Sequence, residues 1–121
     1  MEVPILKQGS FLIATVQAAL SDADLLQFRS ALSQYVVRSR SQGAILDVTD
    51  LDVLDSFASR TIREISQMIR LRGAETVIVG IQPEVAFAMV QLGLTMEGVA
   101  TALDLDEGLD YLNHRSKTAA S

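Results

Sequence analysis

The sequence contains no cysteine and no tryptophan, and its aromatic residues are limited to four Phe and two Tyr. Without cysteine, disulfides, thiolate metal ligands and thiol nucleophiles are excluded, which fits a reducing compartment. So few aromatic rings argue against a base-stacking surface for nucleic acids. The formal net charge of −5 argues further against binding to nucleic acids or to anionic membranes.

Long hydrophobic runs are also missing, since no stretch reaches the roughly 18 apolar residues of a membrane span. The first residues, "MEVPILKQGS", lack the basic and apolar regions of a signal peptide, so we expect a cytoplasmic protein with no membrane partner. The 121 residues, 49% of them hydrophobic, suit one domain with a real core. We assign residues 1–115 to that domain and 116–121, "SKTAAS", to a flexible C-terminal tail.

The first part of the chain predicts a hairpin and a helix. "PILKQGSFLIATV" has the pattern of two short strands joined by a turn at "GS". Ser21 and Asp24 resemble a capping box, and apolar residues then recur at helical spacing to about residue 40. We expect Gly43 to end this helix and "AILDV" to form a buried strand.

The second part of the chain predicts three more helices separated by strands. Helical spacing returns after Asp55 and ends at Gly73, and "TVIVGI" has the β-branched composition of a central parallel strand. A third helix is expected from Pro83 to near Gly93. "GVAT" predicts a weak strand, and Asp104 begins a fourth, amphipathic helix.

The resulting order, β-β-α-β-α-β-α-β-α, defines the expected fold class. A hairpin followed by alternating units predicts an α/β fold with a mixed, mostly parallel sheet and about four helices packed on it. In open sheets of this kind, functional residues gather at the carboxyl ends of strands. The strand "AILDV" ends in this region, and the turn that follows it reads "TDLDVLDS".

The residue types of an enzyme active site are largely absent. A hydrolytic nucleophile needs a base beside it, but the sole histidine, His114, lies at the predicted end of the last helix, where it favourably faces the helix dipole. Neither GxxxxGK[ST] nor GxGxxG occurs, so no phosphate-binding loop is indicated. We therefore expect no enzymatic activity, no catalytic residues and no cofactor.

Four aspartates, Asp47, Asp50, Asp52 and Asp55, surround this turn and have two interpretations. Their carboxylates could hold Mg²⁺ or Ca²⁺, but the spacing is not that of an EF-hand, and the opening strands offer no acidic partner. A solvated turn with a helix cap explains the same residues more simply. The sequence thus favours no metal site here.

Ser56, at the start of the second predicted helix, also has two interpretations. Either Asp55 or Ser56 can cap the helix, and a serine cap contributes about 1 kcal/mol. Ser56 could instead accept a phosphate, which would meet the positive end of the helix dipole and unpaired backbone N–H groups. Helical spacing places Arg60 and Arg63 on the same face as Ser56.

At these residues the chain resembles the STAS domains of bacterial anti-sigma-factor antagonists. "AILDVTDLDVLDSFASRTI" is similar to that family's buried strand, acidic turn and helix opened by Asp-Ser-Phe. Within the family, "VPILKQGSFLIATVQ", "GAILDVTDLDVLDSF", "GIQPEVAFAMVQLGL" and "TALDLDEGLDYL" resemble the RsbS type, the small antagonist of the stressosome. These segments span nearly the whole chain.

The resemblance implies a stress-response phosphoprotein that acts in signal transduction. An RsbS-type protein co-assembles with RsbR-type scaffold proteins into a large oligomer and sequesters an RsbT-type serine kinase. The kinase is released when it phosphorylates the serine of the motif, here Ser56, and a phosphatase resets that serine. The kinase-binding surface would comprise Asp52, Asp55, Ser56, Phe57, Ser59, Arg60 and Arg63. Ser59 and Thr61, one turn further on, are candidates for secondary phosphorylation.

Two other hypotheses remain open from the sequence. STAS folds can bind nucleotides or lipids, so the chain could be a small-ligand sensor, which requires an apolar pocket with converging polar groups. A Mg²⁺-dependent enzyme using the aspartates is the third hypothesis, but it lacks a general base.

Overall fold

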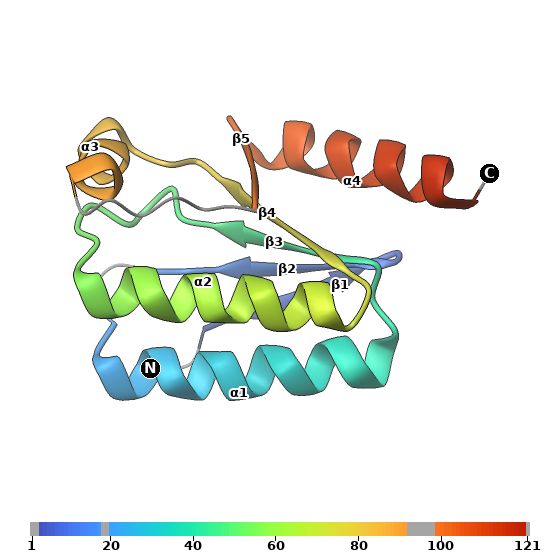
Figure 1. Cartoon of the computed structure of the whole chain (residues 1–121), viewed down its shortest axis with the longest axis horizontal. Helices are drawn as coiled ribbons and strands as arrows, with labels where there is room; N and C mark the ends of the chain where they lie inside the picture. Colours follow the sequence, from blue (N-terminus) through green and yellow to red (C-terminus); the bar gives the residue numbers. More distant parts are fainter. Residues whose placement is uncertain (1–2, 18–19, 92–98, 121) are drawn as a thin grey trace.

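The computed structural model describes residues 3–17, 20–91 and 99–120 of the chain. Strands and helices alternate after an opening hairpin, in the predicted order (Figure 1). The strands are β1 (Ile5–Gln8), β2 (Phe11–Thr15), β3 (Gly43–Asp47), β4 (Glu75–Val79) and β5 (Ala100–Ala102). The helices are α1 (Asp22–Ser39), α2 (Ser56–Leu71), α3 (Pro83–Gln91) and α4 (Leu105–Ala120).

The five strands form one sheet in the order β1-β2-β3-β4-β5. The hairpin pair β1–β2 is antiparallel, and the pairs from β2 to β5 are parallel. The predicted α/β fold with a mixed, mostly parallel sheet is therefore confirmed. Because the three parallel pairs run in the same direction, the carboxyl ends of β2 to β5 lie together at one edge of the sheet.

Helices cover both faces of this sheet. Figure 1 shows α1 and α2 side by side below it and α4 above it, whereas α3 lies beyond the carboxyl ends of the strands. The larger core cluster joins one face of the sheet to α1 and α2, and includes Leu12, Leu32, Leu46 and Ile65. A smaller cluster on the other face includes Ile45, Val77 and Leu112 of α4.

Helix α1 begins as the sequence predicted but ends differently. The Ser21 side chain accepts from the Asp24 N–H, and the Asp24 carboxylate accepts from the Ser21 N–H, so the capping box is present. The helix ends at Arg40, whose φ of 49° is left-handed. Gly43, predicted to end the helix, is instead the first residue of β3, where an added Cβ would lie 2.8 Å from the Leu112 side chain.

Helix α4 begins at the predicted acidic residues. The Asp104 carboxylate accepts from the Glu107 N–H, while the Glu107 carboxylate accepts from the Leu103 N–H. The helix then continues to Ala120, so the backbone has no break at residue 115, where the tail was expected to begin. The predicted end of α3 near Gly93 lies outside the described residues. Within the described part of the chain, no helix has the length and apolar character needed to cross a bilayer.

Candidate functional site at the start of helix α2

The acidic turn joins the carboxyl end of β3 to α2 and is attached to the core by two leucines. Leu51 and Leu54 are buried against the larger core cluster, whereas Asp50, Asp52 and Val53 are exposed. Burial of each leucine contributes about 1.5–3 kcal/mol. The turn therefore presents its carboxylates from a fixed position.

Hydrogen bonds hold the first half of this turn. The Asp47 carboxylate accepts from both the N–H and the hydroxyl of Thr49, at 3.0 and 2.6 Å. The Gln82 amide donates to the Thr49 carbonyl at 2.6 Å and so ties the turn to the segment after β4. Gly80 makes this approach possible: its φ is +78°, and an added Cβ would lie 2.1 Å from the Thr49 hydroxyl oxygen.

Asp55, and not Ser56, is the N-cap of α2. Its backbone is extended, with φ −89° and ψ 176°, and its carboxylate accepts from the Ala58 N–H at 2.7 Å. Ser56 is the first helical residue and is exposed. An α-helix leaves the N–H groups of its first turn without partners in the helix itself, and Asp55 satisfies only one of them. The Ser56 hydroxyl therefore takes no part in the cap, and it lies at the positive end of the α2 dipole.

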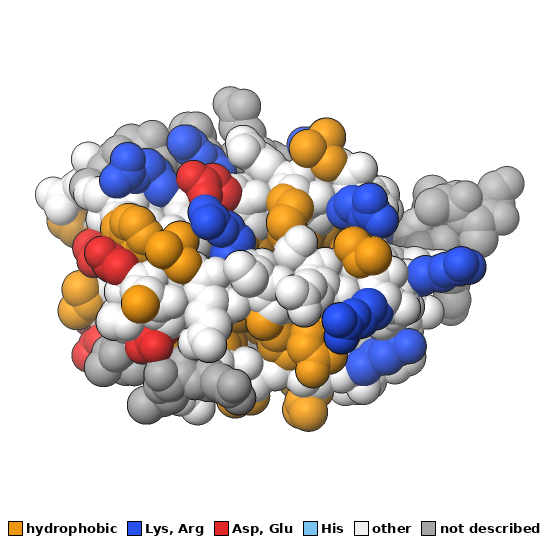
Figure 2. Space-filling model, turned by 90° about the horizontal axis from the view of Figure 1, so that it is seen from below, with side chains coloured by type: hydrophobic (Ala, Val, Ile, Leu, Met, Phe, Trp, Pro, Cys, Tyr) orange, Lys and Arg blue, Asp and Glu red, His pale blue; other side chains and the backbone are white. Residues whose placement is uncertain are grey.

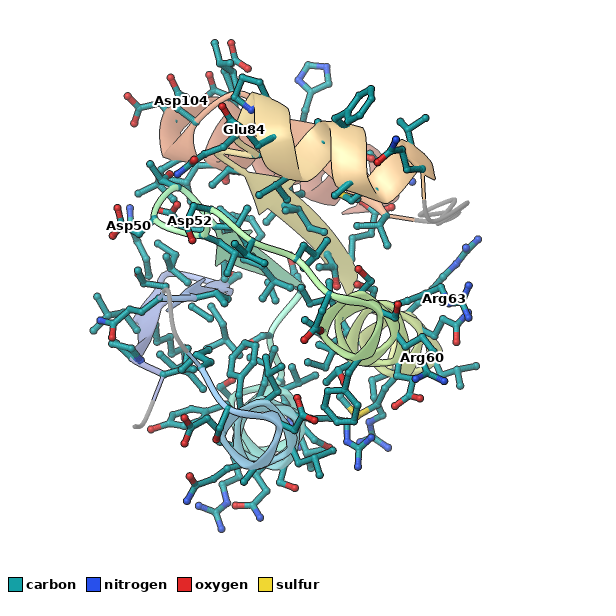
Figure 3. The ribbon with its side chains drawn as sticks, turned by 90° about the vertical axis from the view of Figure 1, so that its left-hand side faces the viewer. Asp50, Asp52, Arg60, Arg63, Glu84 and Asp104 are labelled. Carbon is teal, nitrogen blue, oxygen red and sulfur yellow. The ribbon has the colours of Figure 1, made fainter. Side chains whose placement is uncertain are left out.

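Further carboxylates lie at the same end of the molecule. In Figure 3, which faces the carboxyl ends of the strands, Asp50, Asp52, Glu84 and Asp104 all lie on this side. Asp47 and Asp55 are occupied by the hydrogen bonds just described. Among the described residues, no three acidic or histidine side chains come close enough together to hold a metal ion.

The outer flank of α2 carries the two predicted arginines. Arg60 is exposed and Arg63 is half-buried, and Figure 3 shows both extending from α2 on the side away from Asp50 and Asp52. Half-buried Phe57 lies beside Arg60 in a shallow groove of about 170 Å³ between α1 and α2. The Arg29–Glu64 ion pair, at 2.8 Å, forms part of the same groove.

The predicted site residues therefore fall into two groups. Exposed or half-buried positions are occupied by Asp52, Asp55, Ser56, Phe57, Arg60 and Arg63. Ser59, however, is fully buried, and Thr61 is 3% exposed with its hydroxyl donating to the Phe57 carbonyl. In the folded domain neither hydroxyl can reach a kinase, and Ser59 cannot contact one. The structure thus gives no support to secondary phosphorylation at these residues.

Two features of the site could not be predicted from the sequence. One is the contact of Gly80 and Gln82 with the acidic turn, which joins segments 33 residues apart. The other is a cavity of about 180 Å³ beside the Asp55 cap, between the segments that precede α1 and α2. Its other lining residues are Val16, Leu20, Leu25, Leu51, Val53, Ala58 and Ile62.

Comparison with known proteins identifies the family. The model of the STAS domain matches residues 2–108. This chain belongs to the STAS domain family. The predicted resemblance is confirmed by sequence over most of the chain, as well as by the fold.

Solved structures relate this STAS domain to RsbS. A serine-to-glutamate variant of RsbS from Moorella thermoacetica is 34% identical, with a TM-score of 0.85 over 95% of this chain and 97% of that one. A chain from a structure titled as the molecular architecture of the stressosome, a signal integration and transduction hub, is 32% identical. Its TM-score is 0.79, over 93% of this chain and 98% of that one.

Among curated proteins, this STAS domain is similar to part of several longer proteins. The RsbT co-antagonist protein RsbRA of Bacillus subtilis is 36% identical over 74 residues. The match covers 61% of this chain but only 27% of RsbRA, so the chain spans about a quarter of the length of that relative.

Proposed function

We propose that this STAS domain is a non-enzymatic regulator of an RsbS-type stressosome in the cytoplasm. It co-assembles with RsbR-type proteins, sequesters an RsbT-type serine kinase, and releases that kinase when Ser56 is phosphorylated. A phosphatase returns Ser56 to its unmodified form. The observation that carries this proposal is an exposed serine at the start of α2, outside the cap and next to exposed carboxylates.

The chemistry of this position suits a kinase substrate. A protein kinase supplies the base, the nucleotide and Mg²⁺, so no general base is needed near Ser56 in this chain. The hydroxyl is accessible, and the N–H groups of the first turn of α2 can donate to a phosphate placed there. Asp55 keeps the helix capped in both states, because its carboxylate and not the Ser56 hydroxyl accepts from Ala58.

The negative charge of a phosphate on Ser56 would release the kinase by repulsion. A phosphate adds about −1.5 to −2 charges beside Asp52 and Asp55. Like charges brought together in an interface cost several kcal/mol, and a loss of about 2.8 kcal/mol weakens binding about a hundredfold. Since Leu51, Leu54 and the Thr49 hydrogen bonds fix the turn, this change requires no refolding.

Helix α3 provides a surface for an RsbR-type partner. Val85 faces the core, but Phe87 is 64% exposed and Val90 is 78% exposed. Exposed large apolar side chains on one short helix are typical of an interaction site when they form a continuous patch. This helix is a different element from α2, so the kinase and the scaffold can be bound together.

Kinase binding to matched variants tests the proposal. Ser56→Ala should bind the cognate RsbT-type kinase as tightly as the unmodified protein and keep it bound in the presence of ATP. Ser56→Asp should bind more weakly, although less so than the phosphoprotein, because a carboxylate carries less charge than a phosphate. Release of the kinase from Ser56→Ala at the wild-type rate would refute the proposal.

A second function, small-ligand sensing, is favoured by one observation. A groove of about 500 Å³ lies between the N-terminal strand and α1, within the range of ligand sites. Its lining includes apolar Val3, Ile5, Phe28 and Ala31 and polar Gln27 and Tyr35. A nucleotide or lipid that raises the melting temperature saturably, and fails to do so in Ala31→Phe, would support this function.

A further inference from the structure

Gln82, which directly precedes α3, makes contact with the acidic turn. Its side-chain amide donates to the Thr49 carbonyl at 2.6 Å, while its own carbonyl accepts from the Ala86 N–H at 2.9 Å, in the first turn of α3. One residue therefore contributes both to the start of α3 and to the turn that precedes α2. Figure 2 shows acidic side chains at the left-hand end of the α1–α2 face, where both helices begin and where this turn lies.

The carbonyl that accepts from Gln82 belongs to the central peptide of a β-turn. The Leu51 N–H donates to the Val48 carbonyl at 3.0 Å, so the chain from Val48 to Leu51 forms a hydrogen-bonded turn with Thr49 and Asp50 at its centre. The Thr49 carbonyl and the Asp50 N–H share one planar peptide group. A hydrogen bond to this carbonyl therefore fixes the orientation of the whole central peptide.

The central peptide of a β-turn has two orientations, which differ by a flip of roughly half a turn. The flipped orientation, type II, needs a positive φ at the third residue of the turn, here Asp50. Among the described residues other than glycine, only Arg40 has a positive φ, so Asp50 is in the unflipped orientation. Aspartate tolerates a positive φ better than most residues, so the flipped orientation is accessible to this turn. The hydrogen bond from Gln82 favours the orientation that the structure shows.

The segments on both sides of this peptide are held in place. The Asp47 carboxylate fixes the preceding peptide by accepting from the Thr49 N–H at 3.0 Å. After the turn, Leu51 and Leu54 pack against α3 around a cavity of about 10 Å³, which is about the smallest volume that holds a water molecule. A flip of the central peptide is therefore absorbed by Asp50, whose exposed carboxylate then changes direction.

We propose that Gln82 is a positioning residue for the kinase site, because it holds the acidic turn in the orientation that the RsbT-type kinase recognises beside Ser56. This inference rests on the proposed function and adds to it a residue outside the kinase-binding surface. Preorganisation of a binding surface lowers the cost of association without adding a contact. When only a fraction of the molecules has the competent orientation, the apparent Kd rises by the inverse of that fraction.

NMR spectroscopy of the free protein tests the orientation of the turn. Gln82→Met keeps the length of the side chain but has no donor, whereas Gln82→Lys keeps a donor. The flip brings the Thr49 Hα close to the Asp50 amide proton, so the cross-peak between them should become at least about twofold stronger in Gln82→Met. It should keep its wild-type strength in Gln82→Lys, and both variants should melt within a few degrees of wild type. An unchanged cross-peak in Gln82→Met would overturn the proposal.

Phosphorylation kinetics with the cognate kinase test the consequence for Ser56. In Gln82→Met the KM for this chain should rise at least about threefold while kcat stays within about twofold of wild type, because the Ser56 hydroxyl lies on α2 and does not move with the turn. Gln82→Lys should restore the wild-type KM. Gln67→Met is the matched control, because Gln67 is exposed in the second half of α2, and it should change neither constant.

The failure of this inference can be distinguished from the failure of the proposed function. A wild-type KM in Gln82→Met, or a KM raised equally in Gln82→Lys, would overturn the role of Gln82 and leave the proposed function standing. A wild-type chain that the kinase never phosphorylates on Ser56 would instead overturn the proposed function, and this inference with it. The NMR measurement needs no kinase, so it reports on the turn in either case.

Discussion

Separate substitutions of Asp55 and Ser56 should show that Asp55 stabilises α2, whereas Ser56 contributes little to stability and is available for regulation. The Asp55 carboxylate caps the helix through the Ala58 N–H at 2.7 Å, whereas the Ser56 side chain is exposed and outside the cap. Asp55→Ala should therefore lower the free energy of unfolding by about 1 kcal/mol, within a range of about 0.5–2. Ser56→Ala should change it by less than about 0.5 kcal/mol, as expected for a surface substitution.

Urea unfolding and thermal melting would measure both effects. For a domain of this size, about 1 kcal/mol corresponds to a fall in melting temperature of about 3–5 °C. Asp55→Asn is the matched control, because asparagine caps helices as well as aspartate but carries no charge. If Ser56→Ala destabilised the domain more than Asp55→Ala, the cap assignment would be wrong, and the Ser56 hydroxyl could not be free for modification without weakening α2.

Three further predictions concern other parts of the fold. Ser59→Ala should leave the melting temperature unchanged or raise it by a few degrees, because the buried Ser59 hydroxyl has no hydrogen-bond partner among the described residues; a loss of more than about 1 kcal/mol in urea unfolding would contradict this. Gly80→Ala should destabilise the domain by more than about 2 kcal/mol, because Gly80 has a positive φ and an added Cβ would collide with Thr49. A second substitution, Thr49→Ala, should recover part of that loss. Equal unfolding curves for the single and double variants would exclude the steric contact. Phe87→Glu should melt within a few degrees of wild type, because the side chain is 64% exposed, yet fail to co-elute with an RsbR-type partner in size-exclusion chromatography; unfolding of this variant would place Phe87 in the core.

Elements with a regular apolar period were predictable from the sequence. The apolar stripe of α2 formed by the isoleucines Ile62, Ile65 and Ile69 lies where the local pattern indicated. So do the β-branched strand β4 and the Ser21–Asp24 capping box. Gly43 was misinterpreted because its role depends on Leu112 of α4, which approaches β3 from a distant part of the sequence. A local pattern contains no information about such a contact.

The candidate site was predictable as a location but not in its details. Asp55 and Ser56 are both good caps, and only the extended backbone of Asp55 decides between them. The sequence offers Ser59 and Thr61 as candidates for secondary phosphorylation because they are hydroxyl residues one turn after Ser56. In the structure α2 packs against both α1 and the sheet, so its buried face extends beyond the isoleucines and includes both residues. How far a helix is covered depends on its neighbours, which its own sequence does not specify.

The central claim is tested most directly by mapping phosphate on the intact protein after incubation with its cognate RsbT-type kinase, ATP and Mg²⁺. Mass spectrometry of the whole chain and of its fragments should find a single phosphate on Ser56, and none on the Ser56→Ala variant. Phosphate on Ser59, Thr61 or any other residue while Ser56 stays unmodified would contradict the account, as would a chain that the kinase binds but never modifies.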